Sequence, residues 1–233
     1  LDELLLYGES IGMSLDLTMH ADHYKTFKVS DEGYDISAHK RAIRNTLVRW
    51  GRRPAVRILD MANEAEVRGP SPGSGSPATG HVSPGRFLEM MEVARSVPRT
   101  CLVTCSVSGG GDFPGDVEAN YVALFRSTKG EILLPHFGRK SGWGAREGAL
   151  GADLRRAIPG LQVHHQEPAR NGYNGQNWPV SEFEQSFRTT KAAGAVGCCM
   201  HTDAGFDVRS RDAWDQLDEV ERQVVASLKG WIA

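Results

Sequence analysis

Arg57-Ile-Leu-Asp-Met-Ala-Asn63-Glu64 is a hydrophobic run of strand length that ends in an amide and a carboxylate. A second run, Leu161-Gln-Val-His-His-Gln-Glu167, also ends in a glutamate. A parallel α/β barrel gathers the C-terminal ends of its strands at one face, where catalytic side chains lie. Two strands that each deliver a glutamate there place two carboxylates across one cavity. The pair therefore predicts a functional site.

Composition limits the classes of protein that need consideration. The chain has 233 residues, a formal net charge of −2 and 24% charged residues of both signs. This length suits one domain over residues 1–233. The absence of a basic stripe argues against a nucleic-acid partner, and no apolar run approaches the ~20 residues that cross a membrane. The four cysteines lie inside apolar strands without the spacing of a zinc site, so we interpret them as buried free thiols, which leaves localisation open. An extracellular location or a place in a larger particle is favoured over a membrane.

Strand-length and helix-length patterns alternate along the chain. Strands are predicted at 13–20, 55–63, 100–107, 131–137, 161–167 and 195–201. Helices are predicted at 1–11, 37–50, from 84, and at 116–127, 146–158, 181–193 and 214–231. Six such βα units predict an α/β protein with a parallel sheet. We favour a (β/α)8 TIM barrel that is incomplete at its N-terminus, and the alternative is a doubly wound open sheet.

Local signals refine these helices. Ser37 is a candidate N-cap, and Ser181 with Glu184 has the spacing of a capping box. Core-facing positions are predicted at helical spacing. They are Ile43, Leu47, Trp50, Phe87, Met90, Met91, Ala94, Val97, Leu150, Leu154, Ile158, Leu217, Val220, Val224, Leu228 and Trp231. The Pro/Gly/Ser-rich segment 69–80 is predicted to be a flexible loop.

Polar side chains recur where the predicted strands end, which favours the barrel over the open sheet. An open sheet concentrates its site at one switch point. The strand-end residues are His20, Asn63, Glu64, Ser106, Ser108, His136, Glu167, His201 and Asp203. A single histidine at a strand end is usually structural, but the whole set at one face predicts a site.

Other chemistries fit the sequence poorly. No H-E-x-x-H pair occurs, and the adjacent His164 and His165 point to opposite sides of a strand, so no metal site is predicted. The glycines at 109–111 lack the spacing of a phosphate-binding loop, and no G-x-S-x-G elbow occurs. No cofactor is expected.

On these residues the sequence resembles the retaining glycoside hydrolases of clan A, and most of all the cellulase-type family 5. In that family the third strand ends in histidine, as at His20, and the fourth in Asn-Glu, as at Asn63-Glu64. The sixth strand carries a histidine, as at His136, and the seventh ends in the nucleophilic glutamate, as at Glu167.

The resemblance implies a retaining glycosidase that acts on a β-linked oligo- or polysaccharide. Glu167 is then the nucleophile and Glu64 the general acid and base. Asn63 is expected to bind the sugar 2-OH, and His136 and His165 to orient one of the carboxyl groups.

Further substrate contacts are expected from loops. Trp143, Tyr173 and Trp178 are candidate stacking surfaces for sugar rings. His201 and Asp203 lie where the family usually has a tryptophan and are candidate substrate contacts. His20 is a further candidate substrate contact.

The family's first two strands, with an arginine on the second, have no counterpart in this sequence. We therefore expect sequence upstream of Leu1, or other chains of a larger assembly, to complete the barrel. The alternative function is a catalytically degraded barrel that serves as a carbohydrate-binding or structural part of such an assembly.

Overall fold

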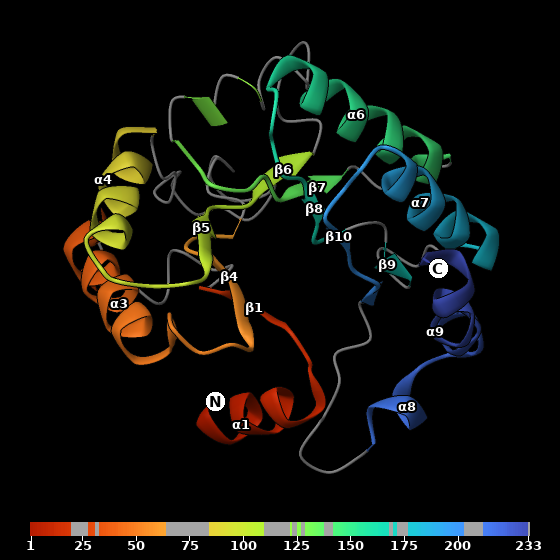
Figure 1. Cartoon of the computed structure of the whole chain (residues 1–233), viewed down its shortest axis with the longest axis horizontal. Coiled ribbons are helices and arrows are strands. Elements are labelled where there is room, and N and C mark those ends of the chain that lie inside the picture. The colour runs from red at the N-terminus through yellow and green to blue at the C-terminus, as the bar shows by residue number, and fades with distance from the viewer. Residues whose placement is uncertain are drawn as a thin grey trace. The chain divides into compact units, whose positions relative to one another are not determined.

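The computed structural model describes residues 1–19, 28–30, 33–63, 84–109, 122, 125–126, 129–137, 142–167, 170–171, 177–202 and 212–232. The chain divides into two compact units. Unit 1 comprises Leu1–Ser108 and Ala119–Leu133, and unit 2 comprises Gly109–Glu118 and Leu134–Ala233. Figure 1 traces the elements of each along the chain. Among the described residues, no helix has both the length and the apolar character needed to span a lipid bilayer.

Unit 1 is built on a parallel sheet. Its elements are α1 (Asp2–Ile11), β1 (Leu15–Thr18), β2 (Lys28–Ser30), β3 (Gly33–Tyr34), α3 (Ile36–Trp50), β4 (Val56–Asp60), α4 (Pro84–Arg95) and β5 (Leu102–Thr104). β6 (Val107–Gly109) runs across the division between the units. The sheet order is β1-β4-β5, with Leu17 opposite Leu59 and Ile58 opposite Leu102. The three parallel strands thus lie in chain order, while β2 and β3 form a separate antiparallel pair.

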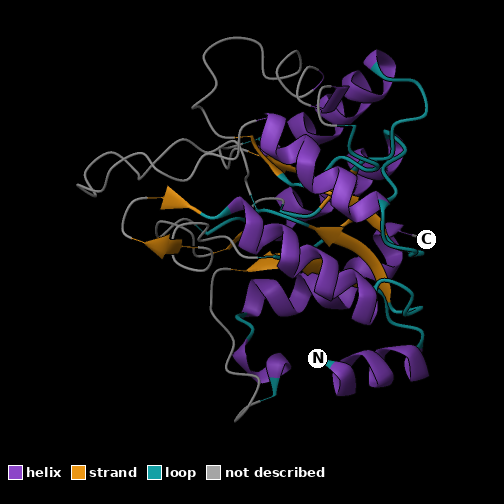
Figure 2. Cartoon of the chain, turned by 90° about the vertical axis from the view of Figure 1, so that its left-hand side faces the viewer, coloured by secondary structure: helices purple, strands orange, loops and turns teal. Residues whose placement is uncertain are grey.

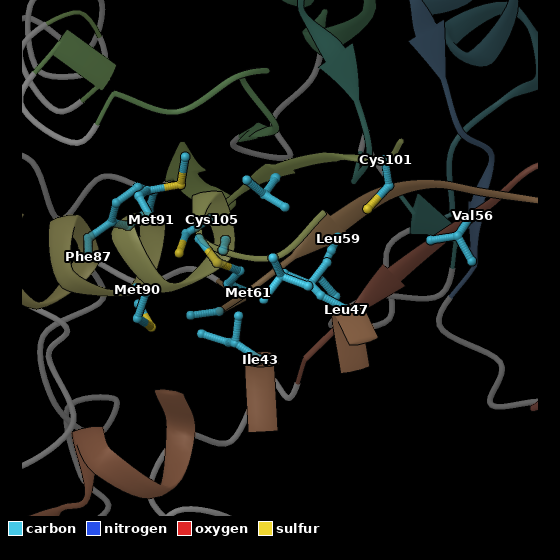
Figure 3. Packing of buried hydrophobic residues seen from close by; sticks show 14 of the residues in the cluster. Ile43, Leu47, Val56, Leu59, Met61, Phe87, Met90, Met91, Cys101 and Cys105 are labelled. Carbon is cyan, nitrogen blue, oxygen red and sulfur yellow. The ribbon is translucent and has the colours of Figure 1, made fainter. Parts of the chain in front are cut away.

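The core of unit 1 lies between this sheet and the helices α3 and α4, which pack side by side (Figure 1). Figure 3 shows Ile43 and Leu47 of α3 meeting Leu59 of β4. Met90 and Met91 of α4 join the same cluster and are 0% exposed. The helical spacing in the sequence therefore identified the buried faces of both helices.

Unit 2 repeats the strand–helix alternation. Its elements are β7 (Pro135–Phe137), α6 (Trp143–Ala157), β8 (His164–His165), β9 (Arg170–Asn171), α7 (Val180–Ala192), β10 (Gly197–Cys198), β11 (His201–Thr202), α8 (Ala213–Gln216) and α9 (Glu219–Ile232). β8 pairs in parallel with β10, and β9 with β11. A parallel bridge joins His136 of β7 to Glu167, just after β8. The helices α6 and α7 have 15 and 13 residues, whereas β8 and β10 have two each. Figure 2 distinguishes the helices and strands of the chain by colour.

Glycine lets α6 and α7 approach closely. A Cβ on Gly144 would lie 2.6 Å from the Glu182 carbonyl oxygen, and one on Gly148 would lie 2.4 Å from Thr189 Cβ. The Thr189 hydroxyl donates a hydrogen bond to the Gly144 carbonyl at 2.6 Å. The predicted face of Leu150, Leu154 and Ile158 was therefore only partly right, because the buried face of α6 is mostly glycine with Glu147 and Leu154.

Two predicted helix starts were wrong. The N-cap of α3 is Asp35, whose Oδ1 accepts hydrogen bonds from the backbone N–H groups of Ser37 and Ala38 at 2.8 and 3.0 Å. α7 follows Pro179 without a side-chain cap, so Ser181 and Glu184 form no capping box. Glu184 instead pairs with Arg188 one turn later.

The closing helix is interrupted, whereas the sequence predicted one helix over 214–231. α8 ends before Leu217, and α9 starts after Asp218. Asp218 Oδ1 accepts from the Glu221 N–H at 2.8 Å, and Glu221 Oε2 accepts from the Asp218 N–H at 2.9 Å. This reciprocal capping box satisfies two N–H groups that a helix start leaves open.

The observed strands are shorter than predicted, with two to five residues in each of β4, β8 and β10. Apolar character continues beyond the point where the neighbouring strands diverge, so composition overestimates strand length. Segment 69–80, residue 20 and most of the predicted helix 116–127 lie outside the described residues. Closure of the strands into one barrel, and the single domain over 1–233, stay predictions.

The capping box at the start of α9 yields a stability test. We expect Asp218→Ala to cost about 1 kcal/mol, because the Glu221 N–H loses its acceptor. For a chain of this size the melting temperature should fall by roughly 2–4 °C. Ser181→Ala is the matched control and should shift the melting temperature much less. Equal shifts in the two variants would contradict this assignment of the cap.

Candidate functional site

In unit 2, Glu167 lies at the end of a strand beside a buried histidine. Its Oε2 is 3.5 Å from Nδ1 of His136, the residue that it faces across the parallel bridge. The His136 side chain is 2% exposed and that of Glu167 is 25% exposed, so the carboxylate reaches solvent while its neighbour does not. His136 Nε2 lies 3.2 Å from Oε1 of Gln166. The two predicted residues are thus brought together, and Gln166 is a contact that the sequence did not predict.

In unit 1, a buried aspartate organises the strand end that leads to Asn63. Asp60 is 0% exposed, and its Oδ1 accepts hydrogen bonds from the N–H groups of Ala62 at 3.3 Å and Ser106 at 2.8 Å. The Ser106 hydroxyl lies 3.5 Å from Asn63 Oδ1. Asp60 therefore ties Ala62, just after β4, to Ser106, which follows β5 and contacts Asn63.

Trp143 is a core residue, contrary to the predicted stacking surface. It is the first residue of α6 and is 1% exposed. Its ring packs edge-on against Phe183 at 5.8 Å and against Trp178 at 6.4 Å between ring centroids. Because the side chain is buried, no sugar ring can stack on it. Trp178 is partly exposed at the edge of this cluster.

His165 contacts Glu147 of α6, whereas the sequence predicted that it orients Glu64 or Glu167. Its Nδ1 is 2.9 Å from Oε1 of Glu147 on α6, and the side chain is 0% exposed. The adjacent His164 lies 3.5 Å, Nε2 to Sγ, from Cys199, which follows β10. The two histidines therefore face different elements, as alternation along a strand predicts.

The remaining predicted positions cannot be placed in the same way. His20, Glu64, Tyr173 and Asp203 lie outside the described residues. For His201 the structure describes the backbone, which pairs with Arg170 of β9. The distance between the two proposed catalytic carboxyl groups therefore stays a prediction.

Sequence reasoning missed two buried acids, Asp60 and Glu147. A signal for Asp60 was present, since an aspartate inside an apolar strand needs buried hydrogen-bond donors. Glu147 carried a weaker signal, because it lies between the glycines of a helix whose leucines drew attention. Both acids became recognisable only through partners far away in the sequence.

An apolar pocket of about 390 Å³ lies elsewhere in unit 2. Its lining includes Phe187, Thr190 and Lys191 of α7, Val196, Cys198 and Leu228. None of the predicted site residues lines it. It therefore does not belong to the strand-end site.

Comparison with solved structures finds TIM-barrel glycoside hydrolases. GH5_18 from Streptomyces cattleya, in complex with GlcNAc, has a TM-score of 0.66 at 14% identity, covering 98% of this chain and 64% of that one. A GH10 endoxylanase from a sugarcane soil metagenome has a TM-score of 0.62 at 14% identity, covering 98% and 80%. This chain thus spans less than two thirds of the length of the GH5_18 protein.

The same fold also occurs with other chemistry. The carboxyl transferase domain of Rhizobium etli pyruvate carboxylase, with pyruvate and biocytin, has a TM-score of 0.53 at 13% identity, covering 99% of this chain and 36% of that one. No protein-family model and no curated protein matches the sequence. At 13–14% identity these likenesses concern the fold alone, and they leave the activity to be argued from the site.

Substitution of Asp60 tests whether its hydrogen bonds to Ala62 and Ser106 hold this part of unit 1 together. Asp60→Ala leaves two buried N–H groups without their acceptor, which we expect to cost about 2–4 kcal/mol of unfolding free energy. Asp60→Asn keeps an oxygen acceptor and should cost less. Urea unfolding measures both variants. A loss below about 0.5 kcal/mol in Asp60→Ala would show that Asp60 does not hold this part of unit 1 together.

Proposed function

We propose that this protein is a retaining glycoside hydrolase that cleaves a β-linked oligo- or polysaccharide. The observation that carries the proposal is the position of Glu167, a partly exposed carboxylate at a strand end, 3.5 Å from buried His136. The fold supports it, since GH5_18 and GH10 glycoside hydrolases share it. The activity is assigned to the whole protein, because the GH5_18 chain extends beyond the part matched here.

The proposed reaction is a double displacement. Glu167 attacks the anomeric carbon, the glycosidic C–O bond breaks, and Glu64 gives its proton to the leaving oxygen. Glu64 then takes a proton from water, the water oxygen bonds to the anomeric carbon, and the bond to Glu167 breaks. This sequence requires the carboxyl groups of Glu64 and Glu167 to lie ~5–5.5 Å apart.

The neighbours of these residues suit the roles assigned to them. His136 can donate a hydrogen bond from Nδ1 to Glu167 and so hold the carboxylate in one orientation. The Ser106 hydroxyl approaches the oxygen of Asn63, which directs the amide N–H groups elsewhere. We assign these N–H groups to the sugar 2-OH, a contact that strengthens in the transition state.

Loss of either carboxyl group tests the mechanism. Using the full-length protein on β-glucan, mannan and xylan, we expect Glu64→Gln to lower kcat/KM about 10²–10⁴-fold by removing the general acid and base. Glu167→Gln removes the nucleophile and should lower it at least as much. The control is Glu184→Gln, which changes an exposed pair with Arg188 and should leave activity unchanged.

Two outcomes would overturn the enzyme assignment. One is that the wild-type protein releases no sugar from any of the substrates. The other is that either glutamine variant keeps full activity. Binding of a polysaccharide without release would support the alternative of a degraded, carbohydrate-binding barrel.

The stereochemistry of the product is a separate test. A retaining mechanism on a β-linked substrate releases the β-anomer first, which ¹H NMR detects before mutarotation. Release of the α-anomer first would indicate inversion. The two carboxyl groups would then be expected ~6.5–9.5 Å apart, with Glu167 activating water.

A further inference from the structure

A buried hydrogen-bonded set in unit 2 connects three elements behind the strand that leads to Glu167. Glu147 of α6 accepts from His165 of β8 at 2.9 Å through Oε1 and from the Ser186 hydroxyl of α7 at 2.6 Å through Oε2. Glu147 and His165 are 0% exposed and Ser186 is 1% exposed. Both carboxylate oxygens are therefore satisfied, each by a different element.

The histidine of this set is fixed in orientation. A carboxylate can only accept, and we therefore assign the proton of His165 to Nδ1. Its Nε2 is buried and has no hydrogen-bond partner among the described residues. That nitrogen faces α6 at Gly151, where an added Cβ would lie 3.2 Å away. Glycine at this position thus makes room for the ring, and the ring is enclosed by α6.

The negative charge of Glu147 acts on a neighbouring thiol, that of Cys198. Burial raises the pKa of the Cys198 thiol well above its ordinary value, and the negative charge of Glu147 adds to this effect. A carboxylate in such a place is retained only when donors compensate it, because an uncompensated buried charge costs several kcal/mol. Removing the donor of His165 or the charge of Glu147 should therefore shift β8 relative to α6.

The set lies two residues from the proposed nucleophile. β8 is held on one side by β10, where the Cys199 N–H donates to the His165 carbonyl at 2.9 Å. Glu147 of α6 contacts the side chain of the same residue, His165. Glu167 follows and meets His136 of β7. A change at Glu147 can therefore reach the His136–Glu167 contact through a single short strand.

We propose that Glu147, His165 and Ser186 are positioning residues, which fix β8 against α6 and α7 and thereby hold the Glu167 carboxylate beside His136. The catalytic part of this proposal rests on the function proposed above. The positioning part concerns the His136–Glu167 contact and can be tested without any substrate.

The first measurement is a ring ¹⁵N NMR spectrum of His136, assigned through His136→Gln. Glu167→Gln should shift the His136 signals, because the acceptor near Nδ1 changes. Glu147→Gln, which keeps the shape of the side chain but removes its charge, should shift them in the same direction. The control is Glu184→Gln, the same substitution at an exposed residue of α7 that pairs with Arg188. It should leave the His136 signals unchanged.

The second measurement is kinetic. A misplaced nucleophile should lower kcat about 10- to 100-fold in Glu147→Gln while KM stays within about 3-fold. His165→Asn keeps an N–H donor near the position of Nδ1 and should recover part of the kcat lost in His165→Leu. The double variant Glu147→Leu/His165→Leu removes both polar partners, and circular dichroism shows whether each variant folds.

These results separate the two proposals. If the wild-type protein is inactive but Glu147→Gln shifts the His136 signals, positioning stands and the proposed function fails. If folded Glu147→Gln leaves both kcat and the His136 signals unchanged, the set only stabilises the fold and the positioning role is overturned. Unchanged signals in the double variant would overturn it as well, even where Glu147→Gln folds poorly.

Discussion

Parallel pairing of short strands is the constraint on which the structure depends. A strand of two to five residues, such as β4 or β8, offers few hydrogen bonds and cannot hold its own position. Each parallel neighbour also requires a crossover, which here includes a helix in unit 1 and in unit 2. Helix packing therefore helps to decide where the ends of the parallel strands lie. The strand ends in turn carry the side chains that we propose for the site.

Both units contain an apolar core, and unit 2 adds a buried polar pair. Unit 1 uses a hydrophobic core in which Met90, Met91 and Leu47 pack on the sheet (Figure 3). Unit 2 uses glycines that let α6 approach α7, and buries the charge of Glu147 against His165. Apolar packing tolerates small shifts, whereas a hydrogen-bonded buried charge does not. The contact between Glu147 and His165, which tolerates less displacement, is the one that lies near Glu167 in the sequence.

Sequence reasoning reached the alternation of strands and helices, the core faces of α3 and α4, and the neighbours His136 and Glu167. It failed for Trp143 and His165, because burial and direction depend on elements elsewhere in the chain. It also failed at the starts of α3 and α7 and at the interruption of the closing helix. A capping box depends on whether backbone N–H groups are open at that residue, and the motif Ser181–Glu184 looked as suitable as Asp218–Glu221.

The sequence by itself determined the periodicity, and with it the βα alternation and the residue types available at strand ends. Periodicity is a property of neighbouring residues, so it can be recognised without a fold. Only the tertiary structure decided that Glu147 meets His165 and that Asp60 receives the N–H group of Ser106. Those contacts join residues from separate elements, and their energies depend on burial, which no local pattern contains.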